Sequence, residues 1–461
     1  MLSRLDNLIT GRIVTPADSD WDAVRQAFNV LLDVRPAAVA LPADARDVVA
    51  IVDYAREHGL RIAPQATGHN AGPLGSDLAD TILVNVRELQ EVTIDPAALR
   101  VRVGAGVKWE RVAPRLSEHG LAGLHGSSPD VGIAGYSLGG GMGWLARKYG
   151  LQTNSVTAME LVTADGRFVR TDAEHEPQLF WALRGGGGNF GVVTAIEFAV
   201  YPVEELYAGA MFFPFERSAE VLHTWRELLP AFPEELMTWA SILHFPPAPF
   251  VPEFARGQSF AVVMGAYLGD EAGGRELLRA VRDLGPAIDT FAMVPPIELA
   301  DLAMDPPDPL PIASTHRMLG ELPAELLDEM LEITGPGGVG GESVAMFQLR
   351  HMGGALARKA PGAGARATLP GEVSLFALGV PMDEESGALL GASLAALHRA
   401  AEPYGVGDYP NFVEEPANVR GFFDAETWER LRWVKAVYDP TDMFRANHHV
   451  PPAVAAAERA A

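Results

Sequence analysis

Short apolar runs alternate with amphipathic stretches along the first 200 residues of the chain. Asp44 precedes a stretch whose apolar residues share one helical face, so the pattern predicts a helix that Asp44 caps and that continues through His58. The other elements predicted here are helices at 109–119 and 178–183, and strands at 38–41, 61–63, 81–86, 100–103, 156–163, 167–170 and 192–200. This alternation is typical of an α+β domain that binds a nucleotide.

From about Leu206 the pattern changes to longer strands separated by longer helices. The predicted strands are 207–213, 239–245, 260–268, 344–351 and 374–380, and the predicted helices are 218–229, 271–284, 324–333 and 384–401. Such elements favour a sheet with helices on one face and the other face left open for a substrate. Alternation along 344–351 puts Met346, Gln348 and Arg350 on one face and the odd-numbered residues on the other. The sequence does not decide which of these faces meets a ligand.

Length and composition limit the class of protein. At 461 residues the chain exceeds the usual size of a single hydrophobic core, so two domains are expected. Hydrophobic residues make up 48% and charged residues 21%, which is typical of a globular protein. No run approaches the ~20 apolar residues that cross a bilayer. The first residues lack a secretory pattern, so a cytoplasmic protein is expected.

Charge and cysteine content exclude further functions. With 36 basic and 60 acidic residues the net charge is −24, which repels nucleic acid and anionic membrane surfaces, so neither is expected as a partner. The chain has no cysteine, which excludes disulfides, thiolate metal sites, iron–sulfur clusters and cysteine nucleophiles. There is no HExxH motif, and the adjacent His448 and His449 do not have ligand spacing, so no metal site is expected.

Residues 135–139 match the G-x-S-x-G motif of serine hydrolases, with Ser137 as the nucleophile. His448, His449 and Asp439 could serve as its partners. In a hydrolase the serine follows a buried central strand, whereas residues 128–134 contain proline, aspartate and glycine, which disfavour such a strand. The hydrolase remains an alternative to the function developed below.

Three glycine-dense loops, at 64–70, 132–143 and 184–191, each follow a predicted strand or precede a predicted helix. Residues without side chains let backbone N–H groups converge on an anion such as a pyrophosphate. The chain has no Walker A sequence, and the glycines at 139–143 do not follow a strand as a Rossmann fingerprint does. The three loops together therefore indicate a phosphate-bearing ligand bound in another way.

Six motifs in this order resemble one known family. They lie at 35–39 with 47–49, at 68–70, at 132–144 with 147–151, at 180–191, at 409–412 and at 438–447. The chain resembles the FAD-linked oxidases of the vanillyl-alcohol oxidase type and, within them, the berberine bridge enzyme-like branch. The resemblance runs through roughly the first 200 residues and the last 50.

The resemblance implies an α+β fold in two domains. A two-part FAD-binding domain would combine residues 1–205 with a C-terminal return, residues 406–461. The inserted substrate-binding domain, residues 206–405, would hold an antiparallel sheet covered by helices. One of the two faces of residues 344–351 would then lie against the flavin.

The resemblance also implies FAD as the cofactor, with His69 bonded through a ring nitrogen to the 8α carbon of the flavin. A neutral imidazole is nucleophilic enough for this bond. Ser128 stands near the place where many members carry a cysteine, and without any cysteine a second, thioether bond is impossible. We therefore expect one bond, although a His69 that is only hydrogen-bonded in its loop stays open as an alternative.

The resemblance assigns two sets of site residues. Tyr409 and Asn411 belong to the motif that faces the flavin, and Tyr409 is the better proton acceptor if a neighbour lowers its pKa. The alternative, a tyrosine that only bonds the cofactor or packs, stays open. The residues assigned to FAD binding are Gln65, Ala66, Thr67, Gly68, His69, Asn70, Pro129, Asp130, Val131, Ile133, Gly135, Tyr136, Leu138, Gly139, Gly140, Gly143, Trp144, Gly188, Asn189, Gly191, Val193, Asn411 and Asn447.

The expected reaction follows from this cofactor. A hydride would move from a small organic substrate (an alcohol, sugar, amine or natural product) to flavin N5, and the electrons would then pass to molecular oxygen. A dehydrogenase on the same fold that uses another acceptor, and a flavin-binding protein without turnover, remain the alternatives beside the hydrolase at Ser137.

Overall fold

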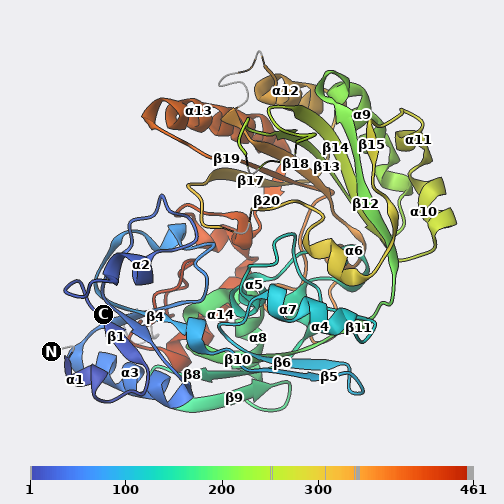
Figure 1. Ribbon diagram of the computed structural model, residues 1–461. Helices are drawn as coiled ribbons and strands as arrows, with labels where there is room; N and C mark the ends of the chain where they lie inside the picture. Colours follow the sequence, from blue (N-terminus) through green and yellow to red (C-terminus); the bar gives the residue numbers. More distant parts are fainter. Residues whose placement is uncertain are drawn as a thin grey trace.

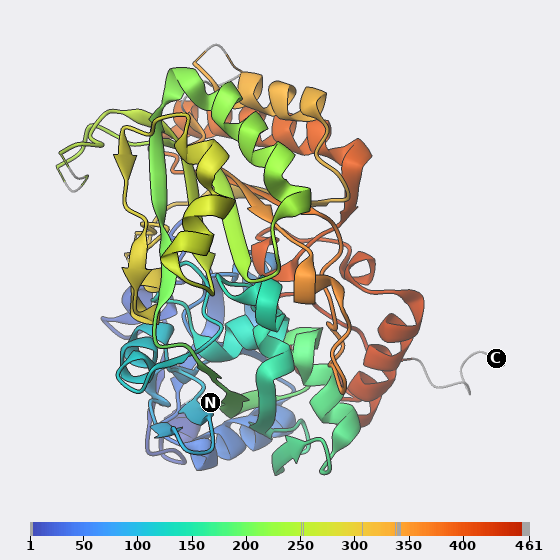
Figure 2. The ribbon, with the colours of Figure 1, turned by 90° about the vertical axis from the view of Figure 1, so that its right-hand side faces the viewer.

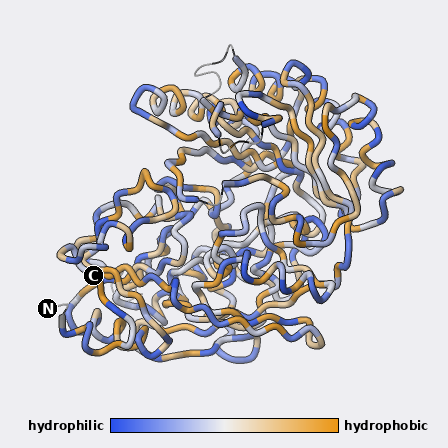
Figure 3. The backbone as a smooth tube through the Cα atoms, viewed as in Figure 1, coloured by the Kyte–Doolittle hydropathy of each residue, from blue (hydrophilic) through white to orange (hydrophobic). Residues whose placement is uncertain are grey.

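The computed structural model describes residues 3–249, 251, 253–306, 308–336, 338 and 343–453. Figure 1 shows the smaller sheets and the C-terminal helix in the lower half of the molecule, and a large sheet with its helices in the upper half; the smaller sheets have four, five and two described strands, the last being β7 (Leu121–Ala122) with β11 (Tyr201–Pro202). In Figure 3 the apolar stretches follow the strands of both halves. The fold is α+β, as the sequence predicted.

The first sheet places one of the glycine loops. Its strand order is β1 (Arg12–Val14), β2 (Arg35–Leu41), β4 (Asp77–Asn85), β3 (Arg61–Gln65). Strands β2, β4 and β3 are parallel, and helix α3 (Ala45–His58) connects β2 to β3. The Asp44 side chain accepts from the backbone N–H groups of Arg46 and Asp47, which confirms the predicted cap. Because β3 ends at Gln65, residues 66–70 leave the carboxyl edge of this sheet, where open parallel sheets bind ligands.

The second sheet is antiparallel and carries two helices with glycine-rich ends. Its order is β5 (Val92–Asp95), β6 (Arg100–Gly104), β10 (Val192–Ala199), β8 (Val156–Val162), β9 (Phe168–Asp172). The predicted hairpin of β8 and β9 is confirmed. Helices α5 (Ile133–Gly139) and α8 (Pro177–Gly186) share one buried apolar cluster with this sheet, in which Leu138 and Leu183 meet Ile196. Both helices therefore hold their glycine ends in fixed positions.

The large sheet spans the middle of the chain and is antiparallel throughout its described strands. Its order is β15 (Ile288–Asp289), β12 (Leu206–Pro214), β14 (Ser259–Tyr267), β13 (Leu236–His244), β18 (Met346–His351), β19 (Val373–Gly379), β17 (Ala313–Leu319), β20 (Gly405–Gly407), with β16 (Ala292–Val294) paired to β12. Helices α9 (Ser218–Leu228), α12 (Ala324–Thr334) and α13 (Glu384–Ala401) cover one face (Figures 1 and 2). On β18, Phe347 and Leu349 lie in the core under these helices.

The other face of the large sheet is open in part: Met346, Arg350 and Phe376 line the cavity described below, and the N-terminal half covers the rest. Trp144, from the loop after α5, stacks on Trp239 of β13 with ring centroids 3.6 Å apart. Leu124 and Leu145 join the same apolar cluster with Phe212 of β12. These contacts cover the part of this sheet face that does not line the cavity described below. Removing its apolar side chains from water stabilises the packing of the two halves.

The C-terminal segment is built into the N-terminal half. Helix α14 (Ala425–Tyr438) holds Lys435 with a fully buried side chain. Its ammonium donates to the Asp439 carboxylate at 2.6 Å and to the carbonyls of Asn189 and Phe444 at 2.9 and 3.1 Å. The ion pair therefore ties the third glycine loop to the return of the chain, which then runs beside β3.

Two predicted helices differ from the structure, and strand β17 is absent from the prediction. Residues 109–119 form a 3-10 turn (Trp109–Arg111) and helix α4 (Ala113–Ser117), because Pro114 lacks the N–H that would continue the first turn. Residues 271–284 form two helices, α10 (Glu271–Leu277) and α11 (Arg279–Arg282), which meet at a non-helical Leu278. Strand β17 was not predicted, since the polar residues 314–317 hide its pattern.

No helix in the part of the chain that the structure describes combines the length and apolar character needed to span a bilayer. Within the same residues no group of three or more histidine, aspartate or glutamate side chains could hold a metal ion.

Lys435→Met should lower the free energy of unfolding by about 3–5 kcal/mol, because it leaves the buried Asp439 carboxylate without its cation. Thermal and urea unfolding of both proteins measure the change. The matched control is Lys359→Met at an exposed position, which should unfold like the parent protein. Equal stability of Lys435→Met and the control would contradict this role for the ion pair.

Candidate functional site

A cavity of about 370 Å³ lies where the two halves and the C-terminal segment meet. Its walls come from the loop after β3, from α5, from the glycine loop after α8, from strands β18 and β19, and from residues 409–423 and 445–448. All three glycine loops that the sequence singled out contribute to one cavity. Segments that are far apart in the chain are thus brought together around a single ligand site.

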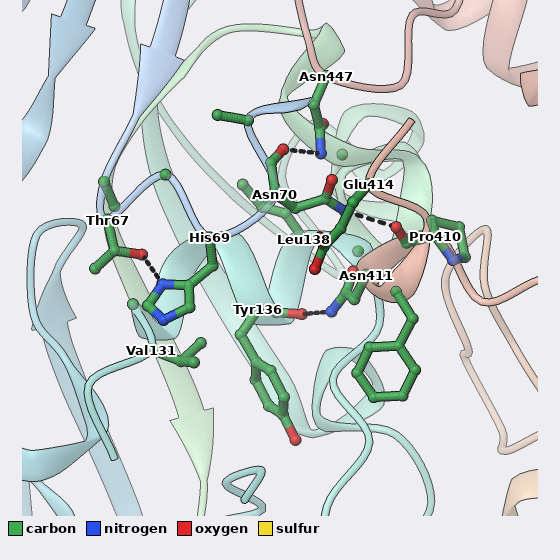
Figure 4. A pocket seen from close by; sticks show the side chains of 18 of the residues that line it. Thr67, His69, Asn70, Val131, Tyr136, Leu138, Pro410, Asn411, Glu414 and Asn447 are labelled. Carbon is green, nitrogen blue, oxygen red and sulfur yellow. Dashed lines mark hydrogen bonds between the residues drawn. The ribbon is translucent and has the colours of Figure 1, made fainter. Parts of the chain in front are cut away.

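Most of the predicted site residues line this cavity. They are Gln65, Ala66, Thr67, Gly68, His69, Asn70, Val131, Gly135, Tyr136, Leu138, Gly139, Gly188, Gly191, Val193, Tyr409, Asn411 and Asn447. Figure 4 shows His69, Asn70, Tyr136, Asn411 and Asn447 around it. The structure brings residues from five separate segments of the chain together.

Seven predicted residues do not line the cavity, namely Pro129, Asp130, Ile133, Gly140, Gly143, Trp144 and Asn189. Their positions give most of them a supporting role. Trp144 and Ile133 lie in apolar cores, and a Cβ on Gly143 would stand 1.7 Å from the His125 carbonyl oxygen. Asn189 donates to the Gly186 and His448 carbonyls and accepts from the Val450 N–H, so it braces the third glycine loop against the C-terminal segment.

The His69 ring is held on three sides. Phe28 stacks on it with centroids 3.9 Å apart and 14° between the planes. The Thr67 hydroxyl lies 2.8 Å from Nδ1, and the Asp130 carboxylate lies 3.3 Å from Nε2 (Figure 4 shows the Thr67 contact). Ser128 donates to the other oxygen of Asp130 at 2.5 Å. These contacts fix both the plane of the imidazole and the surroundings of each ring nitrogen.

Asp130 is a carboxylate in this setting. Burial works to raise its pKa, but contact with His69, the Ser128 hydroxyl and the charge of Lys108 outweigh it, so the pKa lies below its ordinary value. An ionised Asp130 favours a proton on the facing Nε2 of His69. The lone pair of the neutral ring is then on Nδ1, which faces Thr67.

Tyr409 and Asn411 pack directly on the glycines at the end of α5. The Tyr409 hydroxyl oxygen accepts from the backbone N–H groups of Gly141 and Met142 at 2.8 and 3.1 Å, and from Asn411 Nδ2 at 2.9 Å. Asn411 also donates to the Tyr136 carbonyl at 3.0 Å (Figure 4). A Cβ on Gly139 would stand 1.7 Å from Asn411 Oδ1, so this approach requires glycine.

The sequence analysis made Tyr409 a proton acceptor on the condition that a neighbouring group lowers its pKa. The structure does not meet this condition. Burial raises the pKa of Tyr409 well above its ordinary value. The two backbone N–H groups and the Arg366 and Arg350 guanidinium groups lower the pKa, but by less than burial raises it. The phenol is thus neutral at neutral pH, while three donors point at the oxygen that would carry its negative charge.

The cavity walls offer polar groups that the protein does not satisfy. Among the described residues, Gln65 Nε2, Asn70 Oδ1 and His448 Nδ1 are buried without a hydrogen-bond partner. Buried polar atoms are normally paired, so these atoms indicate a ligand with its own donors and acceptors. A Cβ on Gly135 or Gly188, both in the wall, would meet no protein atom within 4 Å. The open space at these glycines lies where a ligand approaches the backbone.

The hydrolase alternative is excluded by the position of Ser137. The residue lies inside helix α5, with no exposed surface, and its hydroxyl donates to the Ile133 carbonyl at 2.7 Å. In the described part of the chain no histidine bonds to it. A nucleophile needs an exposed hydroxyl next to a base.

The further ionisable and aromatic residues that line the cavity include Phe28, Asp305, Arg350 and Glu414, which the sequence analysis did not assign to the site. Phe28 lies in an ordinary apolar run, and Asp305 lies in a proline-rich loop, so neither had a signal. Arg350 was placed on a face but given no role. Glu414 follows the predicted 409–412 motif by two residues, and burial raises its pKa to about 7.

The fold and the site together define a protein that binds a phosphate-bearing redox cofactor. A family model described as an FAD binding domain matches residues 36–172, and one described as berberine and berberine like matches residues 408–451. A curated relative, (R)-6-hydroxynicotine oxidase of Paenarthrobacter nicotinovorans, is 30% identical over 96% of this chain and 97% of its own.

Solved structures agree with these matches. Crystalline 6-hydroxy-D-nicotine oxidase from Arthrobacter nicotinovorans has a TM-score of 0.81 at 26% identity, and the match covers 96% of this chain and 98% of that one. Berberine bridge enzyme from Eschscholzia californica has a TM-score of 0.83 at 19% identity, covering 98% and 99%, and so shares the fold. The chain belongs to the berberine bridge enzyme-like family of FAD-linked oxidoreductases. It is an FAD-dependent oxidoreductase.

Gly139→Ala should weaken FAD binding by about tenfold or more, because the added Cβ displaces Asn411 from the cofactor wall. The ratio of flavin to protein absorbance after purification and dialysis measures retention of the cofactor. Gly421→Ala is the matched control, since its Cβ meets no atom within 4 Å and the residue does not line the cavity. Full flavin content in Gly139→Ala would refute the close-packing argument.

Proposed function

We propose that this enzyme oxidises a small organic substrate with FAD bound covalently to His69 and with molecular oxygen as the electron acceptor. The observation that carries the proposal is the setting of His69 in the cavity wall, between Phe28, Thr67 and Asp130. When bound, FAD supplies a two-electron acceptor for a hydride and passes the electrons to oxygen. Relatives named oxidases, among them xylooligosaccharide oxidase of Thermothelomyces thermophilus, support oxygen as the acceptor.

His69 is suited to a bond through Nδ1. The Asp130 carboxylate, 3.3 Å from Nε2, favours the tautomer with the proton on Nε2. The Nδ1 lone pair of that tautomer accepts from the Thr67 hydroxyl and becomes the nucleophile when this bond is given up. Stacking on Phe28 prevents the ring from turning out of the cavity wall. Since the chain has no cysteine, a cysteinyl bond is impossible and the proposed attachment is single.

Acid precipitation tests the attachment. The pellet of the parent protein should stay yellow, and that of His69→Ala should lose its flavin to the supernatant. Asp130→Asn should lower the covalent fraction severalfold, because the amide no longer fixes the proton on Nε2. Asp283→Asn, at an exposed residue outside the cavity, is the matched control.

Flavin released equally from the parent protein and from His69→Ala would remove the covalent bond from the proposal and leave FAD binding intact. A covalent fraction in Asp130→Asn equal to that of the control would show that Asp130 does not act on His69.

Two groups in the cavity wall could accept the substrate proton. Tyr409 has three N–H donors around its oxygen, which stabilise a phenolate once it forms, and Asn411 supplies one of them. Glu414 has a pKa of about 7, near the value that suits a base at neutral pH. We place Tyr409 first, because its oxygen is fixed by three bonds, and keep Glu414 as the alternative.

The pH dependence of kcat/KM separates the two. Because burial raises the Tyr409 pKa, a Tyr409 base is protonated at neutral pH, and kcat/KM should keep rising about tenfold per pH unit from about pH 6 to about pH 10. Tyr409→Phe should then lower kcat by about 10²–10⁴. Peroxide release on a panel that includes 6-hydroxynicotine, xylobiose and aromatic hydroxy acids supplies the rates.

A plateau above about pH 7 that disappears in Glu414→Gln would assign the base to Glu414 instead. Substrate oxidation that reduces a dye without release of peroxide would replace oxygen as the acceptor and favour the dehydrogenase alternative. The cytoplasmic location stays a prediction from the sequence.

A further inference from the structure

Arg350 is a buried cation in the cavity wall. It lies on β18, on the face opposite the helices, and it lines the cavity together with Met346. Only 4% of its surface is exposed. Its guanidinium carbon lies 4.0 Å from the ring centroid of Trp239 and 4.7 Å from that of Phe412. The planar group is therefore held by two aromatic faces that attract its charge.

A chain of hydrogen bonds fixes the orientation of this guanidinium. Arg350 Nε donates to Gln348 Oε1 at 2.6 Å, and Gln348 Nε2 donates to Ser241 Oγ at 3.1 Å. Among the described residues, no hydrogen bond from the two terminal nitrogens of Arg350 is found, and no carboxylate lies within the 4.0 Å of an ion pair. Burial lowers the Arg350 pKa to about 10, so the group stays charged at neutral pH.

The wall around Arg350 is otherwise apolar on the side of the large sheet. The lining residues from this part of the chain are Asp305, Pro306, Leu310, Ile312, Met346, Arg350, Phe376 and Leu378. Asp305 is the one carboxylate among these described residues, and its charge works to raise the Arg350 pKa against the effect of burial, although no ion pair joins the two side chains. Asp305 is too far away to pair with the guanidinium directly. A buried charge without a partner is unfavourable, so a ligand that brings an anion to the terminal nitrogens is strongly favoured there.

We propose that Arg350 anchors a carboxylate of the substrate, and that the substrate is an apolar or aromatic molecule bearing that carboxylate. A guanidinium presents two parallel N–H donors that match the two oxygens of a carboxylate. The apolar side chains beside it contact the rest of the molecule. A protonated amine of the same size is excluded by like charge. This inference rests on the proposed oxidase function, because it places the substrate in the same cavity.

Binding of three small probes to the purified holoenzyme tests the anchor. Benzoate, benzamide and benzylamine share a ring but carry an anion, a neutral amide and a cation. Calorimetry and the visible spectrum of the flavin both follow their binding. Benzoate should bind at least about tenfold more tightly than benzamide, as expected for a bond between two charged groups, and benzylamine should not bind at millimolar concentration.

Arg350→Gln should abolish the preference for benzoate over benzamide. Arg350→Lys keeps the charge without the two parallel donors and should keep part of the preference. Met346→Leu is the matched control, because this residue lines the cavity on the same face of β18 and should leave the ratio of the two dissociation constants unchanged.

Equal affinities for benzoate and benzamide in the parent protein, or no binding of benzoate, would overturn the anchor. The anchor would also be overturned if Arg350→Gln kept the preference for benzoate over benzamide while the spectrum of its flavin without ligand shifted. Arg350 would then face the cofactor and not the substrate. Calorimetry reads binding without the flavin. A holoenzyme that releases no peroxide with any substrate of the panel would refute the oxidase function, while the benzoate comparison would still decide the role of Arg350.

Discussion

The packing of Tyr409 and Asn411 onto the glycine turn after α5 (Ile133–Gly139) is the contact on which the site depends. The turn offers two backbone N–H groups, at Gly141 and Met142, that have no partner in the helix, and the Tyr409 oxygen accepts from both. Asn411 can lie against the same turn only because Gly139 has no side chain, since a Cβ there would stand 1.7 Å from Asn411 Oδ1. A segment more than 250 residues away in the chain thereby closes the cavity.

The C-terminal segment also contacts the first glycine loop, residues 64–70. Asn70 donates to the Pro410 carbonyl at 2.7 Å, and Asn447 donates to the Asn70 carbonyl at 3.2 Å. The buried Lys435 then holds the third glycine loop through the Asn189 carbonyl. Each glycine loop is thus fixed by the C-terminal segment as well as by its own sheet, which preorganises the backbone for a ligand.

Buried cations join the two halves of the molecule. Arg147, after α5, donates to the carbonyls of Leu236 and Phe232 and to that of Met352, so carbonyl dipoles at the end of the large sheet solvate its charge. Burial lowers the Arg147 pKa to about 10, as it does for Arg350. A chain with a net charge of −24 therefore carries positive charge at the boundary where its cavity lies. The net charge of the sequence did not reveal this local positive charge.

The sequence by itself determined the local elements and the segments of the cofactor site. Periodicity gives helix and strand positions, as in α3 and α13, because it depends on neighbours in the chain. Glycine loops and the 409–412 motif could be read because their chemistry is local. Contacts between distant segments could not be read from the sequence, as the stacking of Phe28 on His69 shows. Nor could the burial that raises the pKa of Tyr409 and that leaves Arg350 without an ion-pair partner among the described residues. Only the tertiary structure decides burial, because it depends on which distant segments exclude water from the same place.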